Sequence, residues 1–186
     1  MAKRELLHSR HVVCQGYALE DGLWEIEGRL SVLKNFAMRN PDRGGLIPLG
    51  EPLHDISLSL TLDSSLQVHA VKVEMAATPF HSCQRVATAF QALKGMQLLP
   101  GFHRSAKERL GGVKGCTHLL ELLVPIATTA YQTLWQSEHG YNGNDPAVSD
   151  FLINSCYALA EDGEVVQSLA HELATLAQHQ PTAANV

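Results

Sequence analysis

The clearest pattern in the chain is a strict alternation of apolar and polar positions over residues 53–62. The apolar positions that share one side of an extended chain are Ile56, Leu58, Leu60 and Leu62. Serine and threonine residues separate them, so the segment predicts a strand with one face against a core. A turn over residues 63–65 then leads into a predicted partner strand over residues 66–75.

A second hairpin is predicted upstream of this one. Residues 11–18 and 23–34 have strand-like patterns and flank Glu20, Asp21 and Gly22, which are typical of a hairpin turn. Residues 40–51 are rich in glycine, proline and charge and are predicted to form a loop.

After residue 79 the apolar residues recur at helical spacing instead. Ser82 is the predicted cap of a first helix that ends at Gly95, and Pro125 predicts a kink in the third. The later helices are predicted over 101–110, 117–138, from Asp145-Pro146 onward, and 164–178, followed by a frayed tail over 180–186. Strands first and helices second indicate an α+β fold with an antiparallel sheet packed against a C-terminal helical layer.

Composition narrows the function classes. The 186 residues include 14 basic and 19 acidic side chains, a net charge of −5, which makes nucleic acid an unlikely partner. No apolar run is long enough for a signal peptide or a membrane span. The four cysteines are too widely spaced for a CxxC pair, and their density is low for a disulfide-stabilised secreted protein of this size. We therefore expect a cytoplasmic protein with reduced thiols and no membrane partner. A protein partner or a second copy of the chain stays open.

Candidate chemistry lies at three predicted element boundaries. His54-Asp55 opens the best strand, His81-Ser82-Cys83 follows the sheet, and Cys116-Thr117-His118 opens the third helix. A cysteine at a helix N-terminus favours the thiolate form. Thiolate, imidazole and carboxylate groups together form a first coordination shell suited to zinc or iron.

Ordinary structural roles compete with this interpretation. Free cysteine is most often a small core residue, which we expect for Cys14 in its strand and for Cys156 on the apolar side of the fourth helix. His54 has the same strand parity as Ile56, so a regular strand would direct Asp55 to the opposite face. Both would reach one metal ion only if the backbone bends there.

Three sequence segments resemble an uncharacterised bacterial family that carries a domain-of-unknown-function label. They are DGLWEIEGRL at 21–30, GEPLHD at 50–55 and ERLGGVKGCTHL at 108–119. The likeness covers nearly the whole chain but implies no function.

Residues 50–131 are also similar in element order to the NifU/IscU scaffolds of iron–sulfur cluster assembly and to the related SufE proteins. In that family one cysteine precedes a hairpin, a second opens a helix and a third opens a long helix; His54 with Asp55, Cys83 and Cys116 with His118 occupy these places. The resemblance implies a scaffold-like core over 50–138 of a single domain, 1–186, with a hairpin and loop over 1–49 and a helical extension over 139–180. Histidine replaces the first cysteine here, so a cluster at this site would need mixed cysteine and histidine ligands.

The leading hypothesis is therefore a zinc- or iron-binding domain with His54, Asp55, Cys83, Cys116 and His118 as ligands. A first alternative makes Cys116 or Cys83 the nucleophile of a sulfur or acyl transfer enzyme, with His118 or His81 as its base. A second alternative is an interaction module that keeps the fold without the metal.

Overall fold

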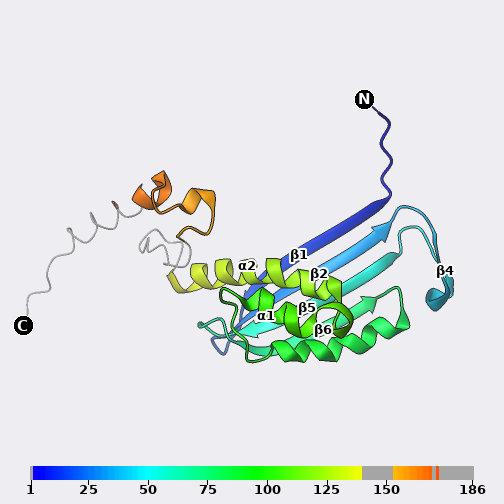
Figure 1. Ribbon diagram of the computed structural model, residues 1–186, viewed down its shortest axis with the longest axis horizontal. Helices are drawn as coiled ribbons and strands as arrows, with labels where there is room; N and C mark the ends of the chain where they lie inside the picture. The colour runs from blue at the N-terminus through cyan, green and yellow to red at the C-terminus, as the bar shows by residue number, and fades with distance from the viewer. Residues whose placement is uncertain (1, 140–152, 169–170, 172–186) are drawn as a thin grey trace, which may run out of the picture. The chain divides into compact units, whose positions relative to one another are not determined.

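The computed structural model describes residues 2–139, 153–168 and 171 (Figure 1). The chain divides into two compact units, residues 1–134 and 135–186, and each is treated by itself below. The prediction of one domain over 1–186 stays a prediction. No described helix is both long enough and apolar enough to cross a membrane.

The first unit is built on a four-stranded antiparallel sheet in the order β1-β2-β5-β6. Its strands are β1 (His8–Ala18), β2 (Trp24–Lys34), β5 (Pro52–Leu62) and β6 (Val68–Ala77). The predicted loop over 40–51 instead contributes to a small second sheet, in which β3 (Met38–Asn40) pairs with β4 (Gly45–Ile47) around the short 3₁₀ helix η1 (Pro41–Arg43). Both predicted hairpins are present in the large sheet.

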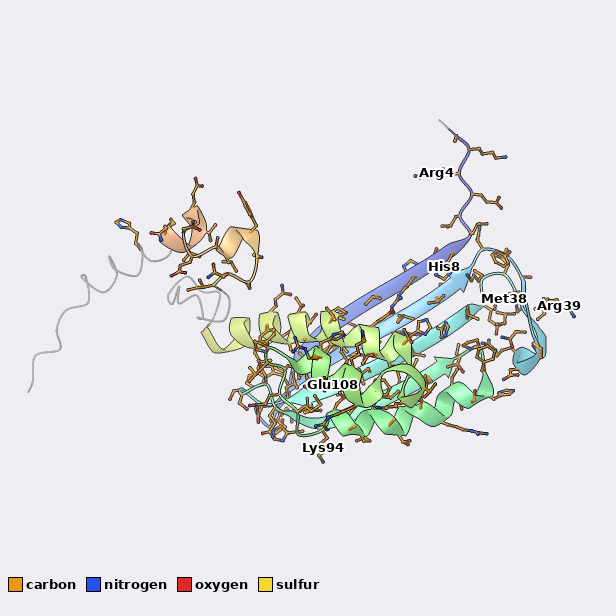
Figure 2. All side chains as sticks on the ribbon, viewed as in Figure 1. Arg4, His8, Met38, Arg39, Lys94 and Glu108 are labelled. Atoms are coloured by element: carbon orange, nitrogen blue, oxygen red, sulfur yellow. The ribbon has the colours of Figure 1, made fainter. Side chains whose placement is uncertain are left out.

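The helices η2 (His81–Leu93), α1 (Phe102–Leu110) and α2 (Thr117–His139) cover one face of the large sheet, with the short turn η3 (Gly112–Lys114) between the last two (Figure 1). Side chains of the sheet and the helices fill the space between them (Figure 2). The alternation in β5 places Ile56, Leu58, Leu60 and Leu62 in this core, each 1 % exposed or less. The predicted α+β class is confirmed.

The helix η2 differs from its prediction. Its hydrogen bonding is of the 3₁₀ type and its N-cap is Phe80, so the expected cap at Ser82 is wrong. Side chains three residues apart align in a 3₁₀ helix, which leaves only Phe90 and Leu93 buried out of the broader apolar stripe.

Two glycines let α2 lie close against β1 and β2. A Cβ atom at Gly28 would stand 2.7 Å from the side chain of Ile126, and one at Gly16 would stand 2.0 Å from the hydroxyl of Thr133. Side chains at these two strand positions would push α2 away from the sheet. This close approach holds the middle and the later part of α2 against the sheet, and the contact between His54 and His118 places its first turn beside the start of β5.

The described part of the second unit contains η4 (Tyr157–Leu159) and a helical stretch over 164–168. The predicted start of the fourth helix at 145–146 and most of the predicted fifth helix lie outside the described residues. Cys156 is exposed and immediately precedes η4, so its predicted burial on a helix is wrong. Cys14, by contrast, packs partly buried against the core of the first unit, as expected.

Candidate functional site

The structure brings together two of the five predicted site residues. His54 is the third residue of β5 and is only 9 % exposed, and His118 lies in the first turn of α2. Their ring centroids are 4.0 Å apart and the ring planes are inclined by 40°. We call these two side chains the imidazole pair.

One ring nitrogen of the imidazole pair makes no hydrogen bond within the described residues. Nδ1 of His54 is buried and, among the described residues, lacks a hydrogen-bond partner. An unsatisfied buried polar atom costs about 1–3 kcal/mol, so native proteins rarely keep one without a ligand, ion or water to meet it.

Arg10 and Glu121 border the imidazole pair, and sequence reasoning missed both. Arg10 Nη2 lies 2.5 Å from Glu121 Oε2, which joins β1 to α2. Arg10 is opposite Val32 in the sheet, and Val32 is opposite His54, so the three residues form one row across three strands.

Both missed residues had a signal in the sequence. A hairpin centred on residue 21 sets Arg10 opposite Val32, and Glu121 follows His118 by three residues on a predicted helix, where side chains share a face. Neither signal indicates on its own that the two lie beside His54. That proximity requires the placement of α2 on the sheet.

The surroundings keep the imidazole pair uncharged at neutral pH. Burial, followed by the nearby His118 and Arg10, lowers the pKa of His54 to about 4. Burial and Arg10 also lower the pKa of His118, while Glu121 acts in the opposite direction. A neutral imidazole has one nitrogen with a free lone pair, the form that binds metal ions.

Asp55 lies on the opposite face of the sheet, although the pairing of β5 with its neighbours is irregular near this point. Its two oxygens accept hydrogen bonds from Arg29, at 2.8 Å from Nε and 2.7 Å from Nη2. This guanidinium holds the pKa of the Asp55 carboxyl below its usual value. With Glu27, Ser57 and Glu74 the pair lines a shallow polar pocket of about 130 Å³ on the face that the helices leave open.

The two candidate cysteines occupy the predicted boundaries. Cys83 is the third residue of η2, and Cys116 directly precedes α2, where its carbonyl accepts the backbone N–H of Leu120. Both side chains are half-buried, and that of Cys116 packs against the core. Within residues 2–139, 153–168 and 171, no three or more His, Cys, Asp or Glu side chains are grouped so as to hold a metal ion. The predicted five-ligand set therefore does not assemble as one group.

Comparison with known proteins identifies a family without a known activity. Residues 8–132 match the model of a family described as proteins of unknown function (DUF2889). No curated protein and no solved structure gives a significant match to the chain. The expected family of unknown function is thus found, whereas the resemblance to iron–sulfur scaffolds and SufE has no support.

Proposed function

The chain belongs to the DUF2889 family, whose function is unknown, and we propose from its site that it is a metal-binding domain in which His54 and His118 hold a zinc or iron ion. The observation that carries this proposal is the buried Nδ1 of His54, which has no hydrogen-bond partner within the described part of the chain, in a ring that contacts His118. When this nitrogen carries no hydrogen, its lone pair can bind a metal ion directly, and a metal ion is one of the few partners that can meet it in a buried position.

A carboxylate for the same ion is close by in the chain. Glu121 lies one helical turn after His118, and two imidazoles with one carboxylate are a common ligand set for zinc and for non-haem iron. In the structure Arg10 engages this carboxylate, so metal binding requires Glu121 to exchange its ion pair for the metal. Asp55 is engaged by Arg29 on the other face, and the proposal leaves it out.

Arg10 therefore opposes metal binding at the proposed site. Its positive charge repels a cation near the imidazole pair, and its ion pair competes for Glu121. Removal of the guanidinium should strengthen metal binding, whereas removal of either imidazole should abolish it. A site that merely needed an intact local structure would weaken in all three variants.

The test is a calorimetric titration of untagged protein with Zn(II) and, without oxygen, with Fe(II). We expect one ion per chain in the wild type, loss of binding in His54→Phe and His118→Ala, and at least a tenfold tighter dissociation constant in Arg10→Met. His103→Ala, which removes an exposed histidine of α1, is the matched control and should bind as the wild type does. Substoichiometric metal that the His54 and His118 variants leave unchanged would contradict the proposal.

The thiol-transfer alternative stays a prediction. Among the described residues, no hydrogen bond joins Cys83 or Cys116 to His81 or His118, which are the bases it requires. The structure therefore offers no specific observation in its favour.

A further inference from the structure

The two edges of the large sheet differ in how they are covered. At the β6 edge the backbone N–H of Val68 donates to Met96, and that of Gly95 donates to the carbonyl of Val68. The side-chain amide of Gln91 in η2 donates to the carbonyl of Val71, at 2.8 Å. The outer edge of β1 pairs with no other segment in the part of the chain that the structure describes.

Within the described residues, the β1 edge also lacks the usual features that prevent pairing with another strand. The strand is eleven residues long, contains no proline, and pairs with β2 without a bulge. Natural proteins shorten, bend, cover or charge such edges because the free N–H and C=O groups bind another strand. The cationic Arg10 is tied to Glu121 in its own chain, and β1 carries no lysine and no acidic residue.

Exposed apolar side chains gather along this edge. Within β1 they are Val12, Val13 and Tyr17, at 42 %, 54 % and 43 % exposure. Leu6, Leu7 and Leu19 extend the exposed apolar surface at both ends of the strand. In Figure 2, His8 marks the beginning of β1 at the border of the sheet. Clustered apolar exposure beside an open strand edge is typical of a protein interface.

We infer that β1 pairs antiparallel with β1 of a second copy of this chain, so that two sheets become one eight-stranded sheet about a two-fold axis. The register that uses all eleven residues sets Val13 opposite Val13 of the partner subunit. In this register Arg10 lies opposite a glycine, His8 opposite an alanine and Val12 opposite a cysteine, because the strand is read against its own reverse. No like charges meet, and each face of the sheet continues across the axis.

This self-complementarity favours a second copy over an unrelated strand. An isologous interface uses the same patch twice and so requires no further surface on the molecule. One strand pair is small beside the ~800 Å² per partner of a standard interface, so we expect a dimer that dissociates on dilution. The inference is independent of metal binding, since β1 contributes no ligand to the proposed site.

The first test is sedimentation velocity of the untagged chain over a range of concentrations. We expect a monomer–dimer equilibrium that Val13→Lys shifts at least tenfold toward monomer, because two ammonium groups would meet at the axis. The matched control is Val113→Lys, the same change at a fully exposed position of η3, which should sediment as the wild type does. A wild-type chain that stays monomeric at about 0.1 mM overturns the inference.

The second test fixes the register and does not depend on Val13→Lys folding. In a Cys14→Ala background, Val13→Cys should cross-link between copies on mild oxidation, because directly opposite Cα atoms lie about 4.5–5.5 Å apart, within disulfide reach. Gln15→Cys, on the same face and edge, would be about 14 Å from its own copy along the strand and should not cross-link. Equal cross-linking of the two variants overturns the proposed register.

Discussion

The two faces of the large sheet give two neighbouring residues, His54 and Asp55, opposite charge states. His54, on the face that α2 covers, is buried and uncharged at neutral pH, and no described residue hydrogen-bonds to its Nδ1. Asp55, one residue later on the open face, keeps its charge and holds Arg29 at 2.7 Å. Two adjacent residues with metal-binding side chains thus lie on opposite faces of the same sheet. Consecutive residues of a regular strand face opposite sides of the sheet, so residue type alone does not show that two of them can bind the same metal ion.

The largest expected effect concerns the pH dependence of the covered face. Because the pKa of His54 is about 4 in the folded chain and about 6.5 when unfolded, the unfolded chain binds more protons between these values. Stability is therefore full above pH 6.5 and falls as the pH drops toward 4, by about 3 kcal/mol at most. Denaturant unfolding at pH 7 and pH 4.5 measures this loss.

His54→Phe should weaken that dependence, because phenylalanine fills a similar volume and cannot be protonated, and the lowered pKa of His118 accounts for the part that remains. His103→Phe, at an exposed position of α1, is the control and should retain the wild-type dependence. An unchanged loss of stability in His54→Phe would show that the covered face does not suppress the charge of this histidine.

A second prediction tests how closely α2 lies on the covered face. Gly28→Val should destabilise the chain by about 2 kcal/mol. Its Cβ would lie 2.7 Å from the side chain of Ile126, closer than van der Waals contact allows, so the helix would have to move. Ser57→Val introduces the same side chain on the face that the helices η2, α1 and α2 do not cover, and should change stability little. Urea unfolding compares the two. Equal destabilisation would contradict the difference between the faces.

The smallest effect is expected on the open face. Asp55→Asn removes a partly exposed ion pair, so the unfolding midpoint should change less than in Gly28→Val. Zinc affinity should stay at the wild-type value, because Asp55 lies across the sheet from His54. A loss of zinc binding in Asp55→Asn, measured by calorimetry, would return Asp55 to the ligand set.

Much of the fold follows from local pattern. The alternation in β5 predicts which residues reach the core, and the turn at residue 21 predicts the β1–β2 register. The cap at Ser82 and the burial of Cys156 were wrong because helical spacing alone does not set where a helix begins or whether its apolar side finds a core. Those properties depend on tertiary packing.

The site was predictable only in part. His54 and His118 were identified as candidates from residue type and position, and strand parity already argued against Asp55. The contact between these two rings depends on how α2 packs on the sheet, where Gly16 and Gly28 leave room for the helix, and no local pattern expresses that packing. The roles of Arg10 and Glu121 follow from the same approach, since each comes from a different element.

The most direct test of the proposed metal site is an NMR titration of histidine-labelled protein with zinc. We predict that the ring signals of His54 and His118 change together and reach their end points at one equivalent of zinc, while those of His103 stay in place. Ring signals of His54 and His118 that do not respond at one equivalent would contradict the account.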